Sequence, residues 1–290
     1  MSTYYINADT GNDSTGDGSS GSPWETFSKA IAQANVSGDG IVLQDSTAHY
    51  LFDDRTFNTS ITVTGESVGG AILDGGGANN LGWSGADSNV VVVSLLDFTN
   101  MNYTQAQKGV YVHKDNATVT FNNCRYYGIT ITQNQGGIFT NDFRSEPGTV
   151  TCNNCLFYDN LGDSSVNSQI FALHRGGNGH TVNANNCSFL FNGGATTEVT
   201  RVFSNVSDNI FFNLKNCIFQ NEQAGDVSMS VGEEVTLTMN HSCTYGGNGA
   251  FTYIPSGTGN ITTDPLFVDV TSNDLRLGGA SPCIGTGVVE

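Results

Sequence analysis

Charged residues that could bind a ligand or move protons recur in one stretch of the chain at intervals of about thirty residues. The sequence of 290 residues has ten Lys and Arg in all, and three of them fall in this series. Its members are His113 and Lys114, then Asp142 and Arg144, then His174 and Arg175. Arginine forks onto carboxylates, and a histidine beside an arginine can serve as acid and base. The series predicts a groove for an anionic or hydroxyl-rich glycan, a lyase site, or ion pairs that bridge neighbouring loops.

Aromatic residues form a second set of candidates. Tyr126, Tyr127, Tyr158 and Phe191 fall on or near positions whose side chains are expected to point outward. Exposed rings stack on sugar faces and anchor interfaces. Tyr127 and Tyr158 are therefore candidates for carbohydrate binding, and the alternative is that these rings cover the flank of the fold beneath a loop.

The best metal-like pattern lies near the N-terminus. Asp13, Thr15, Asp17 and Gly18 match the first half of a calcium-binding loop. The closing bidentate Glu is missing, because Trp24 stands at that position. Asp13 and Asp17 are thus weak calcium candidates, and the prediction is a Gly-rich turn with no bound metal or other cofactor.

Other patterns that could do chemistry are incomplete. The adjacent pair Asp53 and Asp54 has no partner blocks and is interpreted as a solvated turn. No two acids stand one repeat apart with the spacing that a glycosidase needs. Cys152 and Cys155 resemble half of a zinc site, but no second pair with this spacing exists, so a metal role is not predicted.

A repeated block reveals the elements that must position these residues. It first reads Val119-Thr-Phe-Asn-Asn-Cys124, and its copies end 31, 32 and 30 residues further on, at Cys155, Cys187 and Cys217. Apolar residues alternate within each block as in a strand, and their parity reverses directly after it. A straight strand cannot change its buried face, so the chain must turn a corner at an Asn, which tolerates the left-handed backbone conformation. The corner residues are Asn123, Asn154, Asn186 and Asn216.

Each repeat is expected to hold about three short strands. A third apolar column can be aligned through Tyr111, Phe139, Phe171 and Phe203, with Met229 as its next member. Repeats of this length stack on one another. The sequence therefore predicts an all-β fold, a single-stranded right-handed parallel β-helix of about seven coils. Coils would lie about 4.8 Å apart, with corner Asn side chains hydrogen-bonded along the stack and the four block cysteines as small buried spacers.

The two ends of the chain have a different composition from the repeats. Trp24, Phe27, Ile31 and Ala34 recur at helical spacing, and Pro23 suits a first turn. We expect residues 1–40 to form an N-terminal segment with a capping helix, residues 41–250 the β-helix, and residues 251–290 a closing segment. The three parts would make one structural domain.

Composition limits the partners. The net charge of −17 disfavours nucleic acid, because the phosphate backbone would be repelled. No apolar run is long enough to insert into a membrane. The N-terminus lacks the features of a signal peptide, so either a signal was removed or the protein leaves the cell by another route, such as phage assembly followed by lysis.

Several segments spread over nearly the whole chain carry a family resemblance. They are the start, from Tyr4 to Asp13 and on through Pro23-Trp24 to Lys29-Ala30-Ile31, the motifs Phe157-x-x-Asn160, Phe189-x-x-Asn192 and Gly136-Gly137-Ile138, and the end from Thr263 to Gly287. These resemble right-handed parallel β-helix proteins of the pectate-lyase-like superfamily, including phage tailspikes and adhesins. In the closing segment, Cys283 and Gly285-Thr286 replace the usual Ala and Asp-Ala. The superfamily includes lyases, hydrolases, epimerases and non-catalytic proteins, so the resemblance implies a fold and no single activity.

The prediction for function is a non-catalytic protein of a virion or of the cell exterior. It would be a phage fibre, spike or capsid decoration, or an adhesin, whose flank binds glycans or other subunits. Its partners would be cell-surface or extracellular polysaccharide and other virion proteins, and β-helical spikes often form homotrimers. The alternative is a polysaccharide lyase or glycoside hydrolase that acts on acidic polysaccharide.

Overall fold

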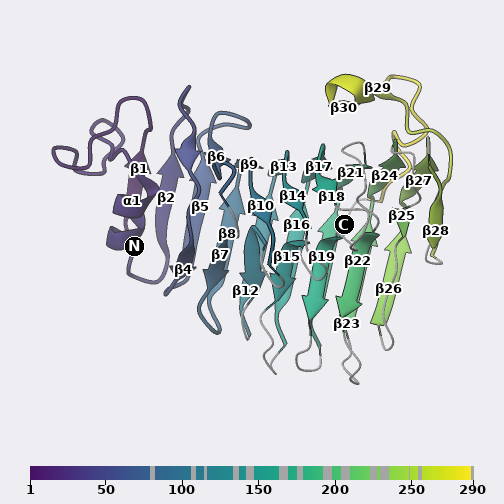
Figure 1. Ribbon diagram of the computed structural model, residues 1–290, viewed down its shortest axis with the longest axis horizontal. Coiled ribbons are helices and arrows are strands. Elements are labelled where there is room, and N and C mark those ends of the chain that lie inside the picture. The colour runs from purple at the N-terminus through teal and green to yellow at the C-terminus, as the bar shows by residue number, and fades with distance from the viewer. Residues whose placement is uncertain are drawn as a thin grey trace.

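The computed structural model describes residues 1–78, 82–105, 109–113, 116–132, 137–141, 147–162, 169–174, 179–191, 198–203, 210–222, 227–228, 235–247, 249–253 and 257–288. These residues form a right-handed parallel β-helix, which confirms the predicted fold class (Figure 1). Each coil contributes a strand to each of three long parallel sheets. Asn192, Met229 and Gly136, which belong to predicted motifs or columns, lie outside the described residues.

The first sheet holds the strands that precede the corner. In spatial order they are β1 (Thr3–Ile6), β2 (Asp39–Leu43), β5 (Ile61–Gly65), β8 (Val90–Ser94), β12 (Thr118–Asn122), β16 (Thr149–Asn153), β20 (Thr181–Asn185), β23 (Ile210–Lys215) and β26 (Val235–Asn240). Within the described residues, seven steps lead from β2 to β26, and every step is a parallel pairing.

The second sheet follows the corner. Its strands are β3 (Tyr50–Leu51), β6 (Ile72–Asp74), β9 (Asp97–Thr99), β13 (Arg125–Tyr127), β17 (Leu156–Tyr158), β21 (Ser188–Phe191), β24 (Ile218–Asn221) and β27 (Cys243–Gly246). The small sheet next to it contains β10 (Asn102–Tyr103), β14 (Thr130–Ile131) and β18 (Leu161–Gly162).

The third sheet completes the coil. Its strands are β4 (Arg55–Phe57), β7 (Trp83–Gly85), β11 (Tyr111–His113), β15 (Gly137–Asn141), β19 (Gln169–His174), β22 (Glu198–Phe203), β25 (Val227–Ser228) and β28 (Phe251–Tyr253). Tyr111, Phe139 and Phe171 are in register, as predicted. The next member of this column is Thr200 rather than Phe203, which pairs with His174. The prediction for Phe203 was wrong because the coil between the two strands is shorter than the one before it.

The corner has the backbone conformation that the reversal of parity predicts. Asn123, Asn154, Asn186 and Asn216 have φ values of 54°, 53°, 55° and 54°. Their side chains do not form the predicted amide ladder, however, and those of the first three are exposed. The ladder lies one residue earlier, where Asn153 Nδ2 donates to Asn122 Oδ1 at 2.9 Å and Asn185 Nδ2 donates to Asn153 Oδ1 at 3.0 Å. These are the last residues of straight strands, so their side chains stack in register, whereas a left-handed residue turns its own side chain out of the stack.

The interior is a stack of like side chains. Phe157, Phe189 and Phe219 lie face to face with ring centroids 4.7 Å and 4.6 Å apart. The block cysteines lie buried beside this stack and form no disulfides. Each thiol donates to a carbonyl of the preceding coil, as from Cys187 Sγ to the Cys152 carbonyl at 3.4 Å. Asn160 of the Phe157-x-x-Asn160 motif is also buried, and its amide bonds the main chain of the coil before it.

Helix α1 (Phe27–Gln33) packs over the N-terminal end of the stack (Figure 1). Phe27 stacks on Trp83 with centroids 5.1 Å apart. At the other end, the hairpin of β29 (Phe267–Asp269) and β30 (Asp274–Leu277), with the 3₁₀ turn Val270–Ser272 between them, stands apart from the coils. Within the described residues, no helix is long and apolar enough to cross a membrane.

Candidate functional site: a polar flank on the second sheet

The outer face of the second sheet carries a buried ion pair between neighbouring coils. Asp97 on β9 and Arg125 on β13 are in register, and Arg125 Nε donates to Asp97 Oδ1 at 2.7 Å while Nη2 donates to Oδ2. The Asp97 side chain is 1% exposed and the Arg125 side chain is 32% exposed. Burial raises the pKa of Asp97, and Arg125 offsets this rise only in part. The guanidinium is therefore held in place by a carboxylate that it neutralises.

A histidine and an aspartate form a second pair on the same face. His49 Nδ1 lies 2.8 Å from Asp74 Oδ2, and Asn100 Nδ2 and the Gly76 amide donate to Asp74 Oδ1 at 2.8 Å and 2.7 Å. Burial raises the pKa of Asp74, but these hydrogen bonds outweigh it, and the pKa lies below the ordinary value. The His49 side chain is 44% exposed, so a fixed carboxylate holds an accessible imidazole.

Tyr127 and Tyr158 stand next to these pairs. They follow Asp74 and Thr99 in one outward column of the second sheet. The two tyrosine rings are stacked with centroids 5.1 Å apart and planes 8° apart, and both are half-buried. Burial raises the pKa of Tyr127, and it raises that of Tyr158 to about 12. Both hydroxyls therefore stay protonated at neutral pH and can donate and accept hydrogen bonds.

We call this surface the polar flank, and it is formed by His49, Asp74, Asp97, Arg125, Tyr127 and Tyr158. Strand pairing places its members on five neighbouring coils, from the coil of β3 to that of β17, each about 4.8 Å from the next. Asp74, Asp97 and Arg125 all influence the pKa of Tyr127, which shows that the charged pairs lie close to the ring. The flank joins aromatic rings, hydroxyls, an imidazole and a charge-balanced ion pair on one surface.

Two aromatic residues predicted near this face point inward instead. Tyr126 and Phe191 are buried. Tyr126 stacks between Phe98 and Phe157 with centroid distances of 5.0 Å and 4.9 Å, because it occupies the inward position between Arg125 and Tyr127. Parity places Tyr127 and Tyr158 outward.

The basic series of the sequence remains a prediction. Lys114, Asp142, Arg144 and Arg175 lie outside the described residues, and only the main chains of His113 and His174 are described. His113 stands two positions after Tyr111, and His174 stands three positions after Phe171. Because Tyr111 and Phe171 share a column, the two histidines do not occupy equivalent positions in the stack.

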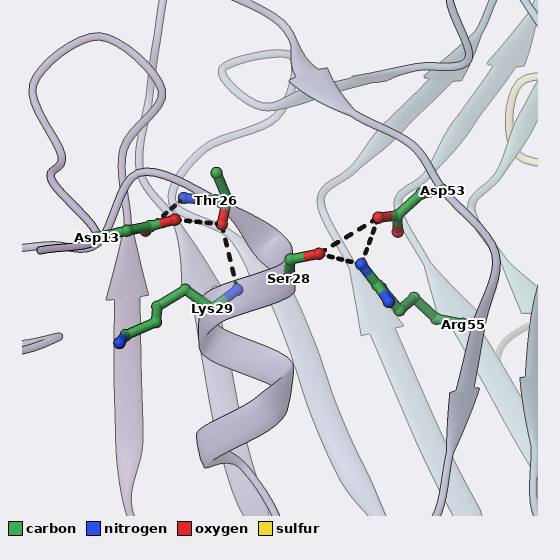
Figure 2. Close-up of polar contacts among 6 residues, drawn as sticks. All are labelled: Asp13, Thr26, Ser28, Lys29, Asp53 and Arg55. Carbon is green, nitrogen blue, oxygen red and sulfur yellow. Dashed lines mark hydrogen bonds and ion pairs between the residues drawn. The ribbon is translucent and has the colours of Figure 1, made fainter.

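The calcium candidates have structural roles near the N-terminus, and Figure 2 shows the contacts of Asp13. Asp13 Oδ1 accepts from the Glu25 and Thr26 amides at 2.9 Å and 3.1 Å, and Oδ2 accepts from Thr26 Oγ1 at 2.6 Å. Asp17 Oδ1 accepts from the Ser19 amide at 2.9 Å. No group of three or more His, Cys, Asp or Glu that could hold a metal ion occurs in the part of the chain that the structure describes.

The Asp13 contacts also correct the predicted helix start. Thr26 is the N-cap, and its Oγ1 accepts from the Lys29 amide at 3.2 Å, so the helix begins at Phe27 rather than near Pro23. Trp24 instead joins the main chain of the first strand, where its amide donates to the Tyr5 carbonyl at 3.0 Å. A cap of this kind satisfies a helix amide that would otherwise lack a partner.

Asp53 is not the solvated residue that the sequence suggested. Its Oδ2 accepts from Arg55, and both side chains meet Ser28 of α1 (Figure 2). Burial raises the pKa of Asp53, and Arg55 opposes this rise. The cluster ties the capping helix to β4, and Asp54 separately accepts from the Gly82 amide at 2.7 Å.

Sequence reasoning missed His49, Asp74, Asp97 and Arg125 as site residues. Asp97 and Arg125 are 28 positions apart and become neighbours only through the register of adjacent coils. The coil that contains Asp97 lacks the Asn-Cys signature, since Leu95 and Leu96 stand there. Leu95 nevertheless adopts the corner conformation, with φ of 60°. Asp97 and Arg125 each stand two positions after a corner residue, Leu95 or Asn123. This equal spacing is the signal that could have revealed the pair.

No protein-family model and no curated protein matches the chain. Similar solved structures include a rhamnogalacturonan lyase, with 13% identity and a TM-score of 0.44 over 90% of this chain and 73% of that one. Pectate lyase Pel9A has 17% identity and a TM-score of 0.44 over 100% of this chain and 92% of its own. Pectin methylesterase PemA from Erwinia chrysanthemi has 11% identity and a TM-score of 0.35 over 90% and 93%.

These likenesses concern the fold alone, since one fold hosts many activities. The resemblance predicted from the sequence is confirmed at that level by the strand order of the β-helix itself. The activity must be argued from the residues of the polar flank.

Proposed function

We propose that this chain is a non-catalytic β-helix protein that binds polysaccharide with its polar flank. The observation that carries the proposal is the stacked, half-buried pair of Tyr127 and Tyr158 beside the fixed Arg125 guanidinium. Carbohydrate sites combine aromatic rings with a few oriented polar groups. Both kinds of group are already held in place here, so little conformational freedom is lost on binding.

The arrangement of the rings favours one kind of contact. Tyr127 and Tyr158 cover one face of each other, because their planes are nearly parallel. What remains for a ligand is the outer edge of both rings with their hydroxyls, together with the second face of Tyr127 toward the smaller Thr99. A sugar chain lying along the stack would receive hydrogen bonds from the hydroxyls and from the free N–H groups of Arg125.

The charge of the flank favours a neutral, hydroxyl-rich glycan. Asp97 neutralises Arg125, and Asp74, whose pKa is lowered by its hydrogen bonds, adds a negative charge to the same face. The whole chain carries a net charge of −17. A polyanion would meet repulsion from this surface, whereas hydroxyl groups would meet donors and acceptors.

We further propose that the protein stands on the surface of a virion or a cell, as a fibre, spike, capsid decoration or adhesin. A stack of parallel coils is a rigid rod that presents one flank along its length. There it would associate with other virion proteins or form a homotrimer. Co-purification with virus particles and the mass in solution would test it.

The experiment is a binding assay against a panel of neutral and acidic polysaccharides, with the double variant Tyr127→Ala, Tyr158→Ala. We expect wild type to bind a neutral polysaccharide with little dependence on salt, and the double variant to lose about ten-fold or more in affinity. Tyr245→Ala is the matched control, because Tyr245 is a partly exposed tyrosine in the same outward column, three coils further on.

Two outcomes would overturn the proposal. Equal binding by wild type and the double variant would remove the flank from recognition. Binding restricted to polyanions, falling steeply with salt and lost in His174→Ala or Arg175→Ala, would move the site to the basic series predicted from the sequence.

A polysaccharide lyase or glycoside hydrolase is the second candidate. The contact between His49 and Asp74 favours it, because a carboxylate that orients an imidazole on an exposed surface is an arrangement suited to a catalytic base. Release of reducing ends or unsaturated products by wild type, and its loss in His49→Ala, would establish catalysis and refute the non-catalytic proposal.

A further inference from the structure

The closing segment at the C-terminal end lies against the last coils and encloses a cleft of about 290 Å³. Asn216 Nδ2 donates to the Val288 carbonyl at 2.9 Å, and the Val288 amide donates to Asn216 Oδ1 at 3.0 Å. Ser281 Oγ donates to the Pro265 carbonyl at 2.5 Å and holds the start of the returning chain. Cys283 lies between these two anchors in the chain. It lines the cleft together with Cys243 of β27.

The two thiols meet across this boundary. Cys283 lies close enough to Cys243 to help raise its pKa, and Cys243 Sγ donates to the Thr263 carbonyl at 3.2 Å. Cys243 is 2% exposed, whereas Cys283 is partly exposed at the cleft. The column of Cys124, Cys155, Cys187 and Cys217 differs, because it is buried in the interior and its members lie on successive coils.

We propose that Cys243 and Cys283 are a redox-sensitive pair, and that a peroxide converts them into a disulfide that locks the closing segment onto the end of the β-helix. The peroxide oxidises the Cys283 thiol to a sulfenic acid and leaves as one water. The Cys243 sulfur then attacks the Cys283 sulfur, the S–S bond forms, and the sulfenic oxygen leaves as a second water. Two thiols lose two electrons, one peroxide gains them, and a dithiol reductant reverses the step.

The order of events follows from exposure. Cys283 reacts first, because the oxidant can reach it through the cleft. Cys243 resolves the intermediate, because it lines the same cleft and lies beside Cys283. Burial raises the pKa of Cys243, so the second step is slow at neutral pH and faster at alkaline pH.

The lock would have a mechanical effect. The disulfide would close a loop of about forty residues that includes the hairpin, and a cross-link of this length disfavours opening by roughly several hundred-fold. In the reduced protein, hydrogen bonds such as those of Asn216 and Ser281 hold the segment. Oxidation would therefore hold the segment closed until a reductant breaks the disulfide.

Trypsin provides a sharp test. Arg276 lies in the hairpin with its side chain 80% exposed, and it is the only Lys or Arg after Lys215. Brief digestion of the native protein after treatment with hydrogen peroxide should cut there. We expect the fragment 277–290 to stay joined to the fragment that contains Cys243, two hydrogens lighter than the sum of the separate fragments, until dithiothreitol releases it. Tandem mass spectrometry would assign the link to Cys243 rather than Cys217.

Two variants control the experiment. Cys283→Ala should release the fragment with or without oxidant. Cys152→Ala should behave as wild type, because it removes a thiol outside the pair from a column in which Ala184 already occupies the equivalent position. The proposal would be overturned by a free fragment 277–290 from oxidised wild type, whether Cys283 is then reduced or over-oxidised, and equally by a link to a second chain.

Discussion

Replacing Arg125 by methionine should cost stability in a manner that depends on pH. The substitution keeps the aliphatic stem but removes the guanidinium, which makes two hydrogen bonds to Asp97. Asp97 is 1% exposed, so its carboxylate would remain buried without a partner. Breaking a buried pair by removing one member costs about 3–5 kcal/mol. We expect the free energy of unfolding of Arg125→Met to fall by that amount at neutral pH.

The sign of the pH dependence follows from Asp97. Its pKa is raised in the folded protein, and it should rise further without Arg125. A carboxyl of this kind stabilises the fold while protonated, and that contribution is lost as the pH rises through the folded-state pKa. The deficit of Arg125→Met relative to wild type should therefore shrink as the pH falls from about 7 to about 4.

Denaturant unfolding at a series of pH values measures this deficit. The double variant Asp97→Asn, Arg125→Met should recover most of the loss, because a neutral amide replaces the unpaired carboxylate. Arg276→Met is the control, since its ion pair with Asp274 is exposed on the hairpin and little change is expected. A deficit below about 1 kcal/mol, or one that is equal at every pH, would refute the account of a buried charge.

Three further predictions concern the stack, the corner and the flank. Phe189→Ala should lower the free energy of unfolding by about 3–5 kcal/mol in urea titrations, because Phe189 is fully buried between two stacked rings; a loss below about 1 kcal/mol would contradict the stack. Asn154→Ala should cost about 1–2 kcal/mol and Asn154→Gly only a few tenths, since φ is 53° and the side chain is exposed; equal effects would argue against backbone strain. Ultraviolet titration should show a tyrosine step with a pKa of about 12 that is lost in Tyr158→Phe, and an unchanged titration curve in that variant would contradict the assignment.

The fold could be predicted from the sequence because its signals are local. The parity reversal at Asn123 and its copies, together with their spacing, specifies a corner that needs one left-handed residue per coil. The structure has that conformation at all four asparagines. The local sequence did not predict features that depend on a contact with a distant residue. The amide ladder belongs to Asn122, Asn153 and Asn185, and the helix starts where Asp13 binds the main chain before Phe27.

The polar flank was harder to predict because its residues lie on different coils. Tyr127 and Tyr158 could be recognised from parity beside the corner. His49 and Asp74 are 25 positions apart in coils that lack the repeated block. The residues next to them in the sequence therefore give no sign that the two side chains meet. Their approach depends on coil length, which varies along the chain, and on loops that carry no periodic signal.

The stacked column of Phe157, Phe189 and Phe219 implies that the rod can change length in whole units. Each ring contacts the ring before it and the ring after it at nearly the same separation, 4.7 Å and 4.6 Å, so neither neighbour needs to be a particular copy. Excising residues 155–186 would join Asn154 directly to Cys187 and preserve the corner and both faces of every strand. Duplication or loss of a single coil could thus lengthen or shorten the protein during evolution without a redesign of either end.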